Sequence, residues 1–283
     1  MGTTGQVHIV TDSACDLDDS EVAELGVTVV PLSIRFGNDE YTDRVDLSVE
    51  KFYTEMARND ALPETAAPSP GAFEDAFRKG AESGASEILC INLSSDLSAT
   101  MAAARTAAKA FEGDIPVEVM DSRSITSGLG TQVREAVRMA QDGSTVGDIT
   151  THLEDMQSRQ VVWGLLDTLE NLKKGGRIGG AQAMIGSLLQ IKPIIDISTG
   201  TVEEFGRQRT RKKAITWLRT QLREAGPIEH LCLMHGMAPD FDALMTQVGE
   251  DRDVGEIHTG HIGAVIGAHG GPRVIGATFV KAR

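Results

Sequence analysis

Short apolar runs alternate with amphipathic or alanine-rich segments along the first half of the chain. Each run has the length of a strand and is followed by polar turn residues, which is typical of strands buried on both faces. The predicted strands lie at 7–10, 27–36, 88–93 and 116–120. Helices are predicted at 21–25 behind a cap at Ser20, and at 49–58, 70–84, 101–110, 128–141 and 148–158. This alternation predicts a parallel sheet flanked by helices, with right-handed crossovers.

The composition changes near Gln160, and we place a domain boundary there, between residues 1–160 and 161–283. Strands are predicted in the second part at 161–166, 192–197, 201–205, 229–234 and 275–280. Helices are predicted at 181–190, from the basic run 207–213 through Leu222, and at 240–248. A turn at 198–200 joins two of the strands as a hairpin, so we expect a second α/β domain with a mixed sheet.

The segment 88–110 is the most informative stretch of the chain, because a hydroxyl-rich turn separates its strand from its alanine-rich helix. The turn holds Ser94, Ser95, Ser98 and Thr100. Ligands of parallel sheets bind at the carboxyl ends of the strands, where free N–H groups of a helix start favour an anion. One hydroxyl is enough to cap a helix. The turn can therefore serve as a cap alone or also hold a carboxylate or phosphate.

Composition and charge narrow the classes of partner. The chain has 283 residues and a formal net charge of −14, which argues against nucleic-acid binding and against adhesion to anionic membranes. No apolar run approaches the length of a membrane span, so no stable membrane insertion is expected. No signal peptide is recognised. The three cysteines lie far apart, which is typical of reduced thiols in a cytoplasmic protein.

Enzyme signatures are missing from the sequence. It has no G-x-S-x-G elbow, no P-loop and no G-x-G-x-x-G, and no cofactor is expected. His258, His261 and His269 lack the neighbouring ligands of a usual metal site, so no metal is expected either. Asp12 and Asp121 each follow a strand and could form an acid/base pair, although such residues more often brace a turn.

Hydroxyl groups remain as the candidate binding groups. Thr65 lies in a proline-rich loop, and Ser122 and Ser124 follow the strand after the hydroxyl-rich turn. Several hydroxyls can hold a carboxylic acid, since a hydrogen bond to a charged group contributes about 1.5–3 kcal/mol. A fatty acyl ligand would also require an apolar tunnel, to which Met184, Ile185, Leu188 and Leu189 could contribute if they do not simply pack in the core.

Together these segments resemble the DegV family, the fatty-acid-binding subunits of bacterial fatty acid kinase. The likeness spans nearly the whole chain and depends on the order of many short motifs rather than on any one of them. The motifs lie at 9–13, 30–32, 65–70, 94–100, 121–122, 172–178, 192–193, 209–214 and 267–272.

The resemblance implies two α/β domains with one long-chain fatty acid buried between them. It implies that Thr65 and the serine-rich turn hold the carboxyl group, with Ser98 favoured and Ser94 and Ser95 as neighbours. His269 would lie close to the carboxyl group. The subunit itself would not be catalytic.

A partner is implied as well. Arg177 and Arg209 would face a separate kinase subunit, which phosphorylates the bound acid with ATP. The chain departs from the family pattern in three places: Ala66 and Ala67 stand where Ser-Gln is usual, Ala99 where Gly is usual, and Arg273 where Gly often ends a Gly-Pro-Gly. These changes affect the expected docking of a kinase more than the binding of a carboxyl group.

Purely structural interpretations of several of these features also remain open. The basic run 207–213 is often only a solvated helix start, 175–180 can be a plain loop, and His269 can be structural. The competing functional interpretation is an enzyme acting on a small carboxylate or phosphate, with Asp12 or His269 as acid or base.

Overall fold

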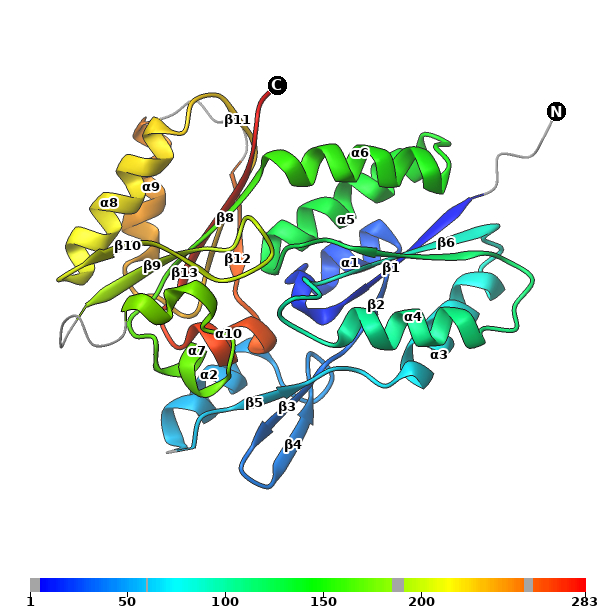
Figure 1. Cartoon of the computed structure of the whole chain (residues 1–283), viewed down its shortest axis with the longest axis horizontal. Coiled ribbons are helices and arrows are strands. Elements are labelled where there is room, and N and C mark those ends of the chain that lie inside the picture. Colours follow the sequence, from blue (N-terminus) through cyan, green and yellow to red (C-terminus); the bar gives the residue numbers. More distant parts are fainter. Residues whose placement is uncertain (1–5, 60, 185–190, 252–256) are drawn as a thin grey trace.

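The structure, a computed structural model, describes residues 6–59, 61–184, 191–251 and 257–283. It is built on a parallel sheet, a mixed sheet and a small antiparallel sheet (Figure 1). The parallel sheet has the order β2-β1-β6-β7. Its strands are β1 (Val7–Asp12), β2 (Thr28–Val30), β6 (Glu87–Asn92) and β7 (Val117–Asp121). The predicted parallel sheet flanked by helices is confirmed.

Helices cover both faces of this sheet, with α3 and α4 on one side and α5 and α6 on the other (Figure 1). Alternate side chains of β6 enter the two layers: Ile88 and Cys90 pack with the aromatic residues of α3, whereas Leu89 and Ile91 join the core around α5. Both faces of the sheet are therefore buried, which explains the continuous apolar run of β6. The helices of this part are α1 (Asp19–Leu25), α2 (Val49–Arg58), α3 (Pro70–Glu82), α4 (Thr100–Ala110), α5 (Thr126–Gln141) and α6 (Val146–Arg159).

Side chains at the helix starts explain most of these boundaries. Ser69 caps α3 with Pro70 in the first turn, as predicted. The predicted cap at Ser20 is wrong: Asp18 accepts the hydrogen bond from the Glu21 backbone N–H, and its carboxylate also suits the positive end of the helix. Helix α6 begins earlier than predicted because Thr145 and Asp148 form a capping box.

The segment predicted as one strand at 27–36 is divided between two sheets. Pro31 cannot donate to a ladder, and the Leu32 N–H donates instead to the Ser13 hydroxyl at 3.1 Å. The chain then enters the small antiparallel sheet, which has the order β4-β3-β5. Its strands are β3 (Ser33–Phe36), β4 (Asp39–Thr42) and β5 (Glu64–Ala66). Strand β5 lies in the stretch predicted as a turn, and it positions Thr65.

The mixed sheet has the order β10-β9-β8-β13-β11-β12. Of the strand pairs in this sheet, β11–β12 is parallel and the others are antiparallel. Its strands are β8 (Gln160–Leu165), β9 (Lys192–Asp196), β10 (Glu203–Gln208), β11 (Ile228–His235), β12 (His258–His261) and β13 (Ile275–Lys281). Helices α8 (Arg211–Glu224) and α9 (Phe241–Asp251) cover its outer face (Figure 1), and the expected mixed sheet is confirmed.

Two short elements of this part escaped prediction, β12 and α10 (Ala264–Gly270). Helix α7 (Glu170–Lys174) is short too. Where a helix was predicted at 181–190, the structure has a 3₁₀ turn, Gly179–Met184. The predicted tunnel residues Ile185, Leu188 and Leu189 lie outside the described residues.

Strand β8 starts at Gln160, the residue at which the sequence predicts a domain boundary. One core nevertheless extends across that point, since Leu129, Val162 and Ile262 belong to the same cluster. Hydrogen bonds also join the two parts, including Tyr53 Oη to the Ile262 carbonyl at 3.0 Å. The division into 1–160 and 161–283 therefore stays a prediction.

Asp12 braces the parallel sheet at the point where β1 and β6 end. Its carboxylate is fully buried and accepts three hydrogen bonds, from Ala14 N, Asn92 Nδ2 and Leu93 N, at 2.9–3.1 Å. Burial raises the pKa of this carboxyl to about 6, and the three hydrogen bonds oppose the rise. The carboxylate therefore fixes where two strands end.

We predict that Asp12→Asn lowers the free energy of unfolding by about 1–3 kcal/mol, because an amide NH₂ would face existing donors. Folding raises the Asp12 pKa, so this carboxyl stabilises the protein most below its unfolded pKa and less as pH rises through about 6. The loss in Asp12→Asn should thus shrink between pH 5 and pH 7 in urea unfolding. Asp39→Asn, on exposed β4, is the control. Equal stability of Asp12→Asn and wild type would contradict the bracing role.

Candidate functional site

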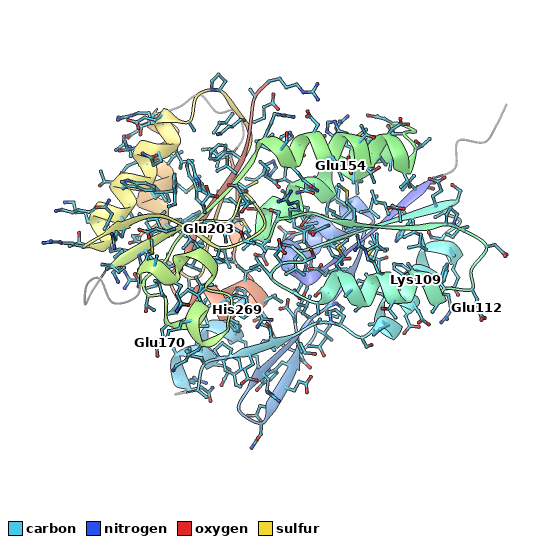
Figure 2. All side chains as sticks on the ribbon, in the orientation of Figure 1. Lys109, Glu112, Glu154, Glu170, Glu203 and His269 are labelled. Carbon is cyan, nitrogen blue, oxygen red and sulfur yellow. The ribbon has the colours of Figure 1, made fainter. Side chains whose placement is uncertain are left out.

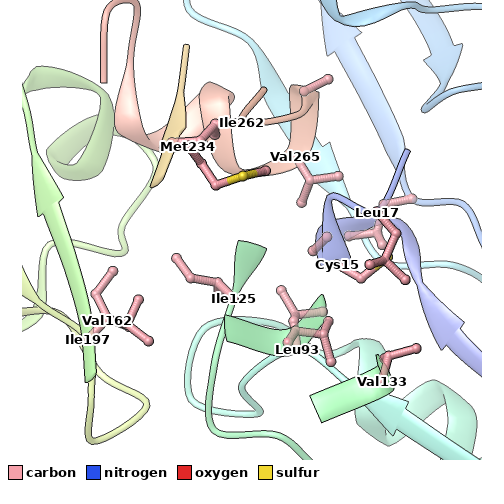
Figure 3. Packing of buried hydrophobic residues seen from close by; sticks show 14 of the residues in the cluster. Cys15, Leu17, Leu93, Ile125, Val133, Val162, Ile197, Met234, Ile262 and Val265 are labelled. Atoms are coloured by element: carbon pink, nitrogen blue, oxygen red, sulfur yellow. The ribbon is translucent and has the colours of Figure 1, made fainter. Parts of the chain in front are cut away.

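An apolar cavity lies between the parallel and the mixed sheet. Its volume is about 150 Å³. For comparison, a cavity needs about 10–15 Å³ to hold one water molecule. In Figure 3, Leu93 and Ile125 approach it from the first half of the chain, and Val162 and Ile197 lie opposite. Apolar side chains from several other elements complete the wall: Leu97, Leu166, Ile195, Val202, Ile262 and Val265. The cavity can hold an apolar group much larger than a few waters.

Thr65 and His269 line one part of this cavity and are joined by a hydrogen bond. The Thr65 Oγ1–His269 Nε2 distance is 2.9 Å, although 204 residues separate the two. His269 lies on α10 near the middle of the molecule (Figure 2), and Thr65 comes from β5. Gly175 backs the imidazole closely, since a Cβ there would lie 2.5 Å from His269 Nδ1.

The imidazole of His269 is held in its neutral form. Burial, reinforced by the positive charge of Arg177, lowers the His269 pKa to about 4. Within the described residues, its buried Nδ1 has no hydrogen-bond partner. The ring therefore offers a neutral, polar contact at physiological pH.

Ser98 also lines the cavity, next to the start of α4. Its hydroxyl lies 2.9 Å from Thr100 Oγ1 and accepts from the Thr100 N–H at 3.3 Å. This bond replaces the cap that Ala99, the residue at the cap position, cannot provide. The hydroxyl of Ser98 thus combines a capping role with access to the cavity.

The other two serines of the turn point elsewhere. Ser94 is buried and donates to the Gly200 carbonyl at 2.6 Å, which ties the turn to the β9–β10 hairpin. Ser95 is exposed and hydrogen-bonds to Asp121. Neither lines the cavity, so their expected contact with a ligand stays a prediction without geometric support.

The two arginines predicted to face a partner are both exposed but lie in different settings. Arg177 borders the cavity and donates to the Leu97 and Gly175 carbonyls at 3.1 and 2.6 Å. Arg209 precedes α8 and does not line the cavity. Arg273, a departure from the family pattern, pairs with Asp167 at 3.4 Å. Its charge is thereby partly balanced.

A polar hollow of about 420 Å³ adjoins the same site. Glu64, Asn171 and Lys174 line it, and Thr65, Arg177 and His269 line both the hollow and the apolar cavity. The Thr65–His269 pair therefore lies where the apolar and the polar space meet.

The residues considered for acid/base catalysis make structural contacts instead. Asp12 lines none of the cavities described above, and Asp121 accepts hydrogen bonds from Ser95 and from the Arg123 N–H. No three His, Cys, Asp or Glu side chains among the described residues are placed to hold a metal. No helix in that part of the chain is long and apolar enough to cross a membrane.

Comparison with known proteins decides the family. The model of the DegV family, described as uncharacterised, matches residues 6–282. This chain belongs to the DegV family. A DegV domain-containing protein of Deinococcus radiodurans is 36% identical over 280 residues, which cover 96% of this chain and 98% of the relative. The resemblance seen in the sequence is thereby confirmed.

Solved DegV structures share the fold over nearly the whole chain. A fatty-acid-binding DegV family protein of Thermus thermophilus is 31% identical, with a TM-score of 0.88 over 98% of this chain and 100% of that one. A stearic-acid-binding protein of Eubacterium ventriosum is 27% identical, with a TM-score of 0.89 over 97% of this chain and 98% of that one. The predicted α/β architecture is thus that of DegV proteins.

The sequence did not predict all of the contacts and elements that hold the candidate site in place. Asn171 Nδ2 donates to the Ala268 carbonyl at 3.0 Å and so joins α7 to α10. Helix α10 itself was not predicted, although Gly263 and Gly271 flank it in the way that glycines flank short helices. That spacing was the available signal.

We predict that the His269 imidazole titrates below pH 5 in NMR spectra of this DegV protein. Because folding lowers its pKa, the group stabilises the protein above pH 6.5 and loses that contribution as pH falls through about 4. Arg177→Met should raise the pKa only slightly, since burial is the larger cause. His269→Gln identifies the resonance. A midpoint near 6.5 in the wild type would show that the ring is hydrated.

Proposed function

We propose that the protein binds one long-chain fatty acid in the apolar cavity, with its carboxyl group at Thr65 and Ser98 and beside His269. The observation that carries this proposal is the Thr65–His269 pair, which lies where an apolar cavity meets a polar hollow. The acyl chain occupies the cavity. The carboxyl group faces the hollow and is presented to a separate, ATP-dependent fatty acid kinase.

The energetics fit this division of roles. Burying an acyl chain contributes about 0.8 kcal/mol per methylene. A carboxylate leaving water needs hydrogen-bond donors, and hydroxyls supply them at about 1.5–3 kcal/mol each. Arg177 at the border of the cavity adds a favourable positive charge. Relatives support the assignment, because the DegV proteins of Thermus thermophilus and Bacillus subtilis are fatty-acid-binding.

The protein acts as a carrier and not as the catalyst. The competing role of Asp12 as acid or base is disfavoured, because its carboxylate already accepts three hydrogen bonds. The chain has no P-loop, so the ATP would come with the kinase. No metal or other cofactor takes part. An ATP-dependent partner fits a cytoplasmic location.

Kinase docking involves exposed basic groups, some beside the hollow and one, Arg209, after β10. The whole chain is acidic, with a formal net charge of −14, and the hollow carries both signs of charge, because Glu64 also lines it and Lys174 pairs with Glu170 at 3.0 Å. Lys174 and Arg177 line the hollow, and Arg209 is exposed beyond β10. We assign to Arg177 and Arg209 the contact with an acidic surface of the kinase.

We predict that native mass spectrometry of the purified protein retains one fatty acid, which is lost on denaturation. Thr65→Val and Ser98→Ala should each weaken fatty acid binding roughly tenfold or more, as expected for the loss of a hydrogen bond to a charged group. Ser95→Ala, which removes a hydroxyl from the same turn but outside the cavity, is the matched control. A bound nucleotide or sugar phosphate in place of lipid would refute the carrier function.

We predict that Arg209→Glu reduces phosphorylation of the bound acid by a fatty acid kinase at least roughly tenfold, through repulsion of an acidic partner surface. Fatty acid affinity should not change, because Arg209 does not line the cavity. The measurement combines transfer of ³²P from ATP with a separate binding assay. Exposed Arg78→Glu on α3 controls for the change in net charge. Unchanged transfer would exclude Arg209 from the docking surface.

A further inference from the structure

A second polar hollow, which we call the α1 hollow, lies apart from the apolar cavity. Its volume is about 590 Å³, within the range of about 300–1,000 Å³ that is usual for small-molecule sites. Residues of α1, of the start of α2, of α5 and of β12 line it, and it shares no lining residue with the apolar cavity. A ligand of the α1 hollow would therefore be distinct from the proposed fatty acid.

Three residues that line the α1 hollow each have a buried polar atom without a hydrogen-bond partner among the described residues. These atoms are Asp43 Oδ2, Arg44 Nη1 and Arg134 Nη1. The side chain of Asp43 is almost completely enclosed, since the residue is 2% exposed. Buried polar atoms are rarely left unpaired, so each of these calls for a partner. One acceptor and two donors are open, so the partner must both donate and accept hydrogen bonds.

The ion pairs of the α1 hollow leave carboxylates in excess. The two arginines are already paired, with Asp19 and with Glu21, whereas Asp16 and Asp43 form no ion pair within the part of the chain that the structure describes. Burial raises the pKa of Asp16 to about 7 and that of Asp43 to about 6, and the charge of Asp43 adds to the rise at Asp16. An ammonium group in the hollow would offset the repulsion between these two carboxylates.

The open atoms and the charges exclude several classes of ligand. A metal ion does not fit, because no three His, Cys, Asp or Glu side chains in the described ranges are placed to hold one. A simple anion would meet the excess of carboxylates, and a simple amine would leave both guanidinium N–H groups unpaired. A ligand with one ammonium and one carboxylate group meets both requirements.

We propose that the α1 hollow binds a free amino acid, with its ammonium group at Asp43 and its carboxylate at Arg44 and Arg134. The ammonium group has three donors and the carboxylate has two acceptor oxygens, which match the open atoms of the wall in kind. All of these hydrogen bonds would join charged groups, and such bonds are about twice as strong as neutral ones. The site is thus a second ligand site, independent of the proposed fatty acid binding.

The first test uses the wild-type protein. Isothermal titration calorimetry measures the binding of each standard L-amino acid, and then of the N-acetyl and carboxamide derivatives of the one that binds most tightly. Acetylation removes the ammonium group and amidation removes the carboxylate. We expect each derivative to bind roughly tenfold or more weakly, as for the loss of a hydrogen bond between charged groups. Undiminished binding of either derivative would overturn the proposal, and so would binding of none of the amino acids, which would leave water as the occupant.

The second test compares Asp43→Asn with Glu24→Gln. Asp43→Asn should bind the free amino acid roughly tenfold or more weakly and should no longer distinguish it from the N-acetyl derivative. A purely structural role of Asp43 would not remove that distinction. Glu24 is exposed and lines the same hollow, so Glu24→Gln removes one charge there and should keep the distinction. Circular dichroism checks the fold of both variants, and a folded Asp43→Asn that still distinguishes the two compounds would overturn the proposal.

Discussion

The hydrogen bond between Thr65 and His269 is the contact on which the site depends. It joins residues 204 positions apart and brings β5, a strand of three residues, against the short helix α10. Burial and the charge of Arg177 keep the imidazole neutral, so the contact adds no formal charge to an apolar region. Gly175 must stay small because its backbone lies against the ring. This one hydrogen bond therefore restricts the positions of β5, of α10 and of the backbone at Gly175.

A cavity in a protein core lowers stability, and close packing normally leaves few cavities. Here the two halves of the chain are held around it by paired polar groups. Ser94 donates to the Gly200 carbonyl, and Ser127 Oγ lies 2.9 Å from Thr278 Oγ1. Each of these buried groups has a partner, so the contacts do not leave unsatisfied donors or acceptors. These contacts join the first half of the chain to the second beside the cavity.

The sequence predicts regular elements well and the site only in part. Long elements such as α3 and α6 have periodic patterns and caps, and the parallel strands have continuous apolar runs. The break at Pro31 and the short α10 depend on tertiary contacts, which no local pattern records. In the serine-rich turn the residue types are alike, and only the fold shows that Ser98 faces the cavity while Ser94 does not. Successive side chains of a turn point in different directions, so composition cannot separate them.

Charge and shape have separate tasks in this arrangement. The polar groups where the cavity meets the hollow are neutral hydroxyls and a neutral imidazole, with the cation of Arg177 at the border. Such groups orient a carboxyl group but contribute less to affinity than the burial of a long chain. The proposed function therefore assigns the orientation of the ligand to the polar groups at Thr65 and His269 and most of the affinity to the apolar wall.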